Sequence, residues 1–321
     1  MKNSSIILSL LAGASALALT GAAIASASTA ETLTEATAPT GKVYRTLEGS
    51  SLVVPVKALR SIEAEYGWKV VLTQGRKNEV RLEYDERIAE YLSVTYEEGK
   101  LELGSSKSKG IRFKDLGNPK KVAFITVTDL REIDLSGAAS LEVKNTIVSR
   151  GKFSLDLSGA SSADNFLLKC RETDIDLSGA SRLVLSVKGT NMLEAEISGA
   201  SRMTLEGSPR RMVVDCSGAG KFEAGKLDLS DLRLELSGAS KAEMSGTAAA
   251  LEAEITGASN LSAQELIVQE CRIELSGASR GTLTVKKSLF ADLNGSSSLN
   301  VYGNPSKVTK DIDRGSDLNI K

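Results

Sequence analysis

Histidine is missing from this chain of 321 residues, which also has only three cysteines, five prolines and 4% aromatic residues. Without histidine, the chain lacks the most common metal ligand and the most common general base. The cysteines, Cys170, Cys216 and Cys271, are odd in number and widely spaced, so they form neither a disulfide framework nor a zinc motif. We therefore predict no catalytic residue, no metal ligand set and no cofactor.

An excess of positive charge is also missing. The chain has 40 basic and 41 acidic residues, which leaves a formal net charge of −1. A protein that holds nucleic acid presents a basic surface to the phosphates. We therefore expect no nucleic acid among the partners.

The first thirty residues have the composition of a secretory signal. Lys2 is basic, Ile6 to Leu19 is an apolar run, and Ala25-Ser26-Ala27 offers a small-x-small cleavage pattern. The alternative is a membrane anchor, but the run is poor in large apolar residues and no basic cluster follows it. We predict a signal peptide over residues 1–27 and a flexible leader over residues 28–56. The mature chain would be exported to the periplasm or the outer cell surface, with no transmembrane span.

What the chain has in abundance is one repeated segment. From residue 130 onward, a Leu-Ser-Gly-Ala-Ser-like corner follows an apolar-acidic-apolar triplet at intervals of 18 to 22 residues. Ten copies at one period are the signature of a repeat architecture. The corner glycines are Gly137, Gly159, Gly179, Gly199, Gly218, Gly238, Gly257, Gly277, Gly295 and Gly315.

The period selects the fold. About twenty residues are too few for a helix pair or a propeller blade, but they fit one turn of a parallel β solenoid. Apolar residues two and four positions before each glycine, such as Ile133 and Leu135, should point inward, and the acidic residue between them outward. We predict an all-β fold, a single-stranded, right-handed parallel β-helix with about ten coils.

The corner reads as a structural part. Glycine tolerates the positive φ that a sharp bend demands, and the serine hydroxyls can bond to backbone groups that the bend leaves unpaired. We expect the alanine after each glycine to face inward, because the corner is narrow there. The motif differs from the Gly-x-Ser-x-Gly elbow of serine hydrolases.

Residues 57–130 lack the corner but still alternate like strands, and we predict that they form irregular first coils that cap the solenoid. Asp85 is a cap for one helical turn up to Tyr91, and Glu98-Gly99 is a hairpin turn. Residues 131–321 form the repeat coils. The β-helix domain thus covers residues 57–321.

A family resemblance follows from the order of these segments. Arg60–Glu63 (RSIE), Val71–Gly75 (VLTQG), Glu98–Leu103 (EGKLEL) and Val122–Val127 precede the first corner. This order resembles the bacterial GIN-domain family, described as the head of an auto-transporter adhesin, over residues 57–310. The resemblance implies a β-helix in the envelope or at the surface of a Gram-negative bacterium, with adhesion as its function.

The acidic residues between the inward positions are the sharpest candidate site. They should stack about 4.8 Å apart and repel one another by roughly 1 kcal/mol per pair in water. Basic residues three positions after the corner glycine should form a second column: Arg182, Arg202, Lys221, Lys241 and Arg280. The acidic column is either a solvated mixed-charge face or a strip that binds divalent cations or sugars. Its members are Asp134, Asp156, Asp176, Glu196, Asp215, Glu235, Glu254, Glu274 and Asp292.

Two classes of function remain. The first is an exported, non-catalytic binding or structural protein that presents a repetitive face to a polysaccharide or to a protein of the cell envelope or surface. The alternative is a β-helical carbohydrate-active enzyme, a polysaccharide lyase or hydrolase. Such enzymes need a cleft built by loops that interrupt the coils, and the nearly constant coil length argues against one. We predict the first class.

Overall fold

The computed structural model of the protein describes residues 36–37, 43–45, 47, 49–105 and 117–321. These residues are almost all in strands, and one 3-10 helix, η1 (Glu86–Tyr91), interrupts them. The predicted signal peptide lies outside the described residues. The all-β prediction is confirmed, whereas the right-handed winding stays a prediction.

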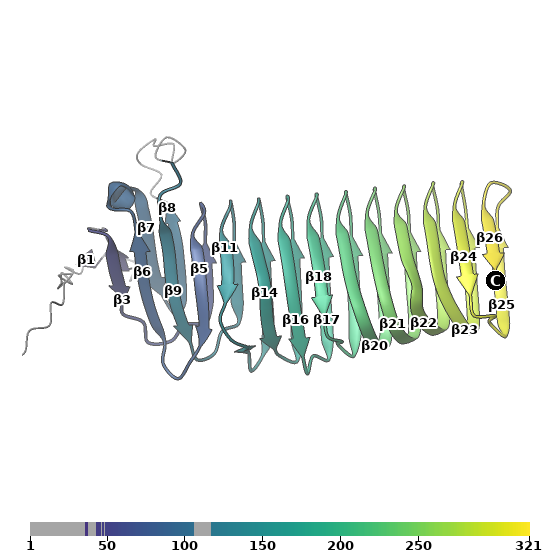
Figure 1. The fold of residues 1–321 in the computed structure, drawn as a ribbon, viewed down its shortest axis with the longest axis horizontal. Coiled ribbons are helices and arrows are strands. Elements are labelled where there is room, and N and C mark those ends of the chain that lie inside the picture. Colours follow the sequence, from purple (N-terminus) through teal and green to yellow (C-terminus); the bar gives the residue numbers. More distant parts are fainter. Residues whose placement is uncertain (1–35, 38–42, 46, 48, 106–116) are drawn as a thin grey trace, which may run out of the picture. The chain divides into compact units, whose positions relative to one another are not determined.

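The strands belong to two regions, a mixed N-terminal cap and a parallel solenoid (Figure 1). The cap contains β1 (Ala36–Thr37), β2 (Val43–Arg45), β3 (Ser51–Val54), β4 (Ser61–Ala64), β5 (Lys69–Gln74), β6 (Glu79–Tyr84), β7 (Leu92–Glu97), β8 (Lys100–Ser105) and β9 (Lys121–Val127). The solenoid begins with β10 (Glu132–Leu135), β11 (Ser140–Val143), β12 (Ile147–Val148), β13 (Lys152–Leu157), β14 (Ser162–Lys169), β15 (Glu172–Leu177), β16 (Arg182–Lys188), β17 (Met192–Ile197), β18 (Arg202–Glu206) and β19 (Arg211–Cys216). It continues with β20 (Lys221–Leu236), β21 (Lys241–Ile255), β22 (Asn260–Leu275), β23 (Arg280–Leu293), β24 (Ser298–Tyr302), β25 (Lys307–Ile312) and β26 (Asp317–Ile320).

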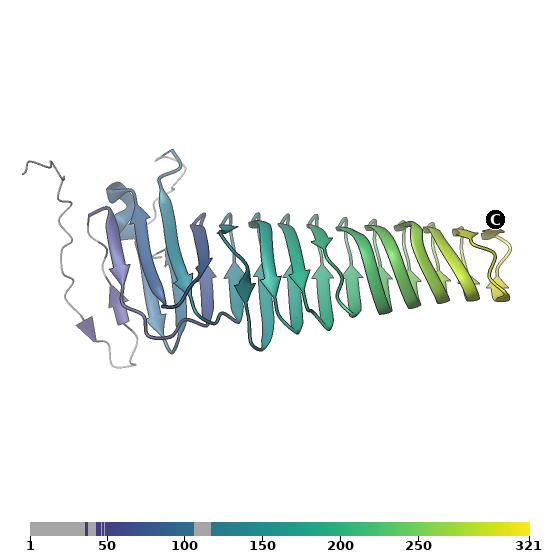
Figure 2. The same ribbon diagram turned by 60° about the horizontal axis from the view of Figure 1, so that its bottom comes forward.

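Each solenoid coil pairs in parallel with the coil before and after it, and Figure 2 shows the coils following one another along a single axis. One face carries the strand before each corner, as in β13, β15, β17 and β19, and the other face carries the strand after it. In β20, β21, β22 and β23 a single bent strand runs from one corner to the next. The predicted inward residues are buried, with Ile133, Leu135 and Leu275 at most 1% exposed. Their side chains fill the solenoid from end to end.

The corner glycines hold the coils at their spacing. Nine of them, from Gly137 to Gly295, have φ between 66° and 80°. In each coil from Ala160 to Ser296, the N–H of the residue after the glycine donates to the glycine carbonyl of the coil before, at 2.7–2.8 Å. A Cβ on Gly199 would lie 2.5 Å from the carbonyl oxygen of Gly179, so this contact leaves no room for a side chain.

The orientation of the residues after the glycine differs from our expectation. Alanines such as Ala160 and Ala180 are exposed at the tip of the corner, and the serines that follow, such as Ser181, point inward and are buried. The prediction of an inward alanine was wrong, because a serine hydroxyl at the inward position can donate to backbone carbonyls of the corner. The Ser181 hydroxyl donates to the carbonyl of Ser178 at 2.7 Å or of Leu157 at 3.0 Å.

The C-terminal end of the glycine column is shifted by one residue. The register places Ile312 beside Leu293 and Asp317 beside Ser298, so Arg314, not Gly315, occupies the last place in the glycine column. The assignment of Gly315 as a tenth equivalent corner was therefore wrong. At this last corner the Asp313 carboxylate accepts a hydrogen bond from the backbone N–H of Gly295 at 2.7 Å.

The N-terminal cap reverses the order of two coils. Strand β4 pairs in parallel with both β10 and β8, and β5 pairs with both β11 and β9. The coil made by β4 and β5 therefore lies between the first repeat coil and the coil made by β8 and β9, although it precedes both in the chain. The first coils, which we predicted to be irregular, pair in parallel like the repeat coils, but their order along the solenoid differs from their order in the sequence.

Antiparallel strands then cover the outer coil of the cap. β7 pairs with β8 and β2 with β7 on one face, while β6 pairs with β9 and β3 with β6 on the other (Figure 1). The flexible leader predicted over residues 28–56 does not extend to β2 and β3, because β2 pairs with β7 and β3 pairs with β6 as further antiparallel strands. Covering an open sheet edge in this way removes a site of aggregation.

Two local predictions within the cap are confirmed. The carboxylate of Asp85 accepts from the backbone N–H of Arg87 at the start of η1. Glu98 and Gly99 have φ of 50° and 87° and join β7 to β8 as a tight antiparallel hairpin. Such positive φ values at both central residues match the right-handed twist of the strands.

The C-terminal coil has no further strand beside it among the described residues, so β25 and β26 are edge strands. Its inward positions are occupied by Val308, Lys310 and Ile312, which pair with Leu289, Ala291 and Leu293. Lys310 is the charged member of a column that is otherwise apolar. Inward-pointing charge on an edge strand opposes edge-to-edge pairing with another chain.

We predict that Gly199→Ala destabilises the protein much more than Gly189→Ala. Gly189 has a φ of 67° but open space around its Cβ position, so its replacement costs only the left-handed conformation, about 1–2 kcal/mol. At Gly199 the clash with the neighbouring coil adds at least about 2 kcal/mol. Urea unfolding of both variants measures the difference, and equal losses would contradict the corner contact.

We also predict that Lys310→Val promotes end-to-end association. The substitution joins Val308 and Ile312 in an unbroken apolar strip along an edge strand, which is a template for pairing with another chain. Lys307→Val, on the same strand but outward-facing, is the matched control. Sedimentation velocity should show oligomers for Lys310→Val alone; oligomers with the control, or with neither variant, would show that Lys310 does not guard this edge.

Candidate functional site

The acidic column exists as predicted and is longer than predicted. All nine carboxylates from Asp134 to Asp292 are paired in register on neighbouring strands. The column continues through Glu63 and Glu102 at the N-terminal end and Asp311 at the C-terminal end. Adjacent members lie about one strand spacing apart, roughly 4.8 Å. We call this set of twelve residues the acidic ladder.

Only parts of the acidic ladder are neutralised. Lys100 forms ion pairs with Glu63 at 2.6 Å and with Glu102 at 3.1 Å. Arg233 and Arg272 contact Glu235 and Glu274, two residues further along their own strands. In the part of the chain that the structure describes, no ion pair reaches Asp134, Asp156, Asp176 or Glu196.

Three carboxylates of the acidic ladder have raised pKa values. Partial burial, and then the charges of Asp134 and Asp176, raise the pKa of Asp156 to about 6. Burial is also the main cause that raises the pKa of Asp134, and burial followed by Glu235 raises that of Asp215. These three carboxylates therefore bind protons more tightly than isolated ones, because they are partly buried and because like charges stack beside them.

The ladder does not gather its carboxylates around a point. Among the described residues, no group of three or more aspartate, glutamate or cysteine side chains converges so as to hold a metal ion. The three cysteines are free and buried, and burial raises the pKa of Cys170 and Cys216 to about 11 and of Cys271 to about 12. Such thiols are neutral core residues.

The predicted basic column lies on the other side of the corner. Arg182, Arg202, Lys221 and Lys241 follow one another in register, then Asn260 and Arg280. Its ion pairs go to its own face, for example from Arg182 to Asp164 at 3.6 Å. The basic column therefore does not relieve the acidic ladder; Lys100, Arg233 and Arg272 do.

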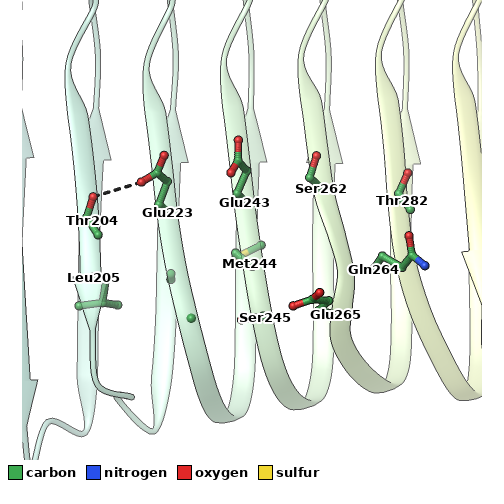
Figure 3. A pocket seen from close by; sticks show the side chains of 12 residues that line it. Thr204, Leu205, Glu223, Glu243, Met244, Ser245, Ser262, Gln264, Glu265 and Thr282 are labelled. Atoms are coloured by element: carbon green, nitrogen blue, oxygen red, sulfur yellow. Dashed lines mark hydrogen bonds between the residues drawn. The ribbon is translucent and has the colours of Figure 1, made fainter.

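A groove that we did not predict lies on the face after the corner. It has a volume of about 710 Å³ and crosses β18, β20, β21, β22 and β23. Figure 3 shows that one row of its lining contains Thr204, Glu223, Glu243, Ser262 and Thr282, one from each neighbouring strand. We call these five residues the polar row. Each lies five positions after its corner glycine.

Missing side-chain bulk makes the groove. Seven positions after the corner glycine stand Glu206, then Gly225 and Ser245 in the next two coils, then Gln264. The floor of the gap is formed by Leu205, Ala224 and Met244, which stay at most 6% exposed. Gly225 and Ser245 are small residues at the same position of two consecutive repeats. The sequence alone does not show that this position faces a groove, so we did not predict the site.

A second hollow of about 600 Å³ lies on the face before the corner. Arg233 and Arg272 line it, and the Arg272 guanidinium lies 4.2 Å from the ring centre of Phe290. Both guanidinium groups are already paired with ladder carboxylates. These two groups are thus occupied by the protein itself, while Arg211, Glu252, Glu270 and Lys307 also line the hollow.

We predict that Asp156→Asn stabilises the protein at pH 8 by about 1 kcal/mol, a figure reduced for solvent screening. Asp156 binds its proton more tightly in the folded state, where its pKa is about 6, than in the unfolded state near 3.9. The stability of the parent protein should therefore fall as the pH rises from 4 to 6, and the variant should lose part of that slope.

Glu274→Gln is the matched control for this measurement, because Arg272 already neutralises Glu274. Urea unfolding at pH 4.5 and pH 8 should show stabilisation at pH 8 for Asp156→Asn and none for Glu274→Gln. An equal gain at both pH values would contradict the repulsion argument.

Comparison with known proteins places this architecture in a family. A structure of a "putative adhesin" from Parabacteroides merdae matches with a TM-score of 0.46 and 15% identity, over 85% of this chain and 95% of its own. A "putative lipid binding protein" from Parabacteroides distasonis gives 0.45 and 14%, over 84% and 96%, and a "putative adhesin" from Bacteroides fragilis gives 0.33 and 16%, also over 84% and 96%. No curated protein matches.

No helix in the described ranges is long and apolar enough to cross a bilayer. The family model described as "Putative auto-transporter adhesin, head GIN domain" matches residues 58–228 and 184–305. Together these matches cover the cap from β4 onward and nearly every repeat coil. The chain therefore belongs to the GIN-domain family of auto-transporter adhesin heads.

Proposed function

We propose that the protein is an exported, non-catalytic binding protein of the cell envelope that holds a molecule of the cell surface. The observation that carries the proposal is the uninterrupted solenoid, whose outward residues form columns in register over many coils. Such a surface offers one chemical group repeatedly along one direction. Membership of an adhesin-like family supports the same function.

Export is part of the proposal and rests on the sequence. The residues that read as a signal peptide lie outside the described part of the chain, so the support is their composition and the adhesin-like family. The periplasm and the outer cell surface are both compatible with it. Protease treatment of intact cells separates the two locations, because only a surface protein is cleaved.

Several observations argue against catalysis. The coils carry no long insertion between corners, and no buried histidine or reactive thiol is present. In the groove, the Lys221 ammonium holds the pKa of Glu223 below its usual range, so this carboxylate is ionised. Hydrolysis of a glycosidic bond needs a carboxylic acid with a raised pKa beside a second carboxylate.

We predict that the purified protein binds isolated cell envelopes of the bacterium that produces it, saturably and without changing them. Co-sedimentation over a range of protein concentrations measures binding, and a reducing-sugar assay detects bond cleavage. Protein unfolded by heat is the control for adsorption. Absence of saturable binding would refute the proposed function, and release of reducing ends would favour the enzyme.

A further inference from the structure

We propose that the groove over β18, β20, β21, β22 and β23 binds an extended polysaccharide that carries no negative charge. This inference rests on the proposed function and adds the place and the chemistry of binding. It is carried by the shape of the groove, by the side chains that line it and by the sign of their charge.

The shape fits a linear polymer. The polar row crosses five neighbouring strands in the direction in which the coils stack (Figure 3), so at about 4.8 Å per strand it is roughly 20 Å long. Each coil adds the next side chain of the row in the same orientation, because the strands are in register. A chain that repeats along its length can therefore meet the same kind of group at each step.

The lining matches sugar hydroxyls, which both donate and accept hydrogen bonds. Thr204, Ser262 and Thr282 supply hydroxyls, and Glu223 and Glu243 supply acceptors. Below the row, Gln264 and Glu265 line the groove, and neither side chain has a hydrogen-bond or ion-pair partner among the described residues. Their polar atoms are therefore available to a ligand without the loss of an existing contact.

The charge of the groove selects against anionic polymers. Lys221 forms ion pairs with both Glu223 and Glu243, the second at 3.2 Å. The charged residues of the lining itself are Glu223, Glu243 and Glu265, so the lining is negative. The basic column borders it two positions before the polar row, at Arg202, Lys221, Lys241 and Arg280. An acidic polysaccharide or a nucleic acid would be repelled, whereas a neutral or amino-sugar chain would not.

Other occupants fit less well. The floor of Leu205, Ala224 and Met244 is small and shallow, and the lining contains no aromatic residue, so a lipid chain or a large apolar side chain would stay mostly exposed. A peptide strand that extends a sheet needs a free edge, but β20, β21 and β22 are each paired on both sides here. The observations therefore favour a glycan.

Affinity electrophoresis of the purified protein in gels that contain one polysaccharide each tests the inference. The probes are mannan, xylan, a mixed-linkage β-glucan and chitosan, with alginate and polygalacturonate as anionic comparisons. We expect retardation by at least one of the first four and none by the last two. Retardation only by the anionic polymers, or by none of the six, overturns the inference.

Matched variants then locate the site. Glu243→Gln and Glu252→Gln change exposed carboxylates on the same strand, β21, but only the first lies in the groove. Ser245→Tyr fills the groove, and Thr247→Tyr adds the same ring two residues further on, outside its lining. We expect at least tenfold weaker binding for Glu243→Gln and Ser245→Tyr and less than twofold change for the controls.

Gln264→Ala is a third groove variant, which should not disturb folding because it only shortens an exposed side chain. It should weaken binding at least threefold while the thermal unfolding curve stays unchanged. If all groove variants bind polysaccharide like the parent, the groove is not the site. Should the protein bind envelopes but no uncharged glycan, the proposed function stands and this inference fails.

Discussion

The whole solenoid depends on one backbone contact at its corner. The N–H of the residue after each corner glycine meets the glycine carbonyl of the coil before, at 2.7–2.8 Å, and the glycine can take a φ near 70° because it has no side chain. With a Cβ in that place, neighbouring coils could not approach to their strand spacing. The inward serine adds a side-chain hydrogen bond to backbone carbonyls on the inner side of the bend.

A fixed register has an electrostatic consequence. Since equivalent residues stack, one acidic residue per coil becomes a ladder of like charges. Among the residues that the structure describes, only Lys100, Arg233 and Arg272 neutralise parts of it. Burial, and after it the charges of Asp134 and Asp176, raise the pKa of Asp156 to about 6, so part of the repulsion remains. The burial of the apolar columns must offset this cost, because each buried aliphatic side chain contributes roughly 1.5–3 kcal/mol before the entropy of ordering the chain is subtracted.

The repeat made much of the fold predictable. Its period and its alternation of apolar and acidic residues correctly predicted the parallel coils, the inward Ile133 and Leu135 and the nine central ladder carboxylates. The cap was less predictable, because pairing of β4 with both β8 and β10 depends on tertiary contacts and has no periodic signal. At the corner we judged the inward residue by its size and predicted alanine. Hydrogen bonding of the hydroxyl places the serine there instead.

The groove shows how a solenoid can form a site without an inserted loop. In most folds binding residues lie on loops that a rigid scaffold positions, but here the coil length is nearly constant. Removing side chains from one column at Gly225 and Ser245 lowers the surface over two coils, while the adjoining column keeps its polar groups. The strand register shifts locally at these positions, between Ala224 and Leu227 and between Glu243 and Gly246, but the corner glycines and the polar row stay in register. Substitutions within outward columns can therefore alter what the protein binds while the corner contact preserves the fold.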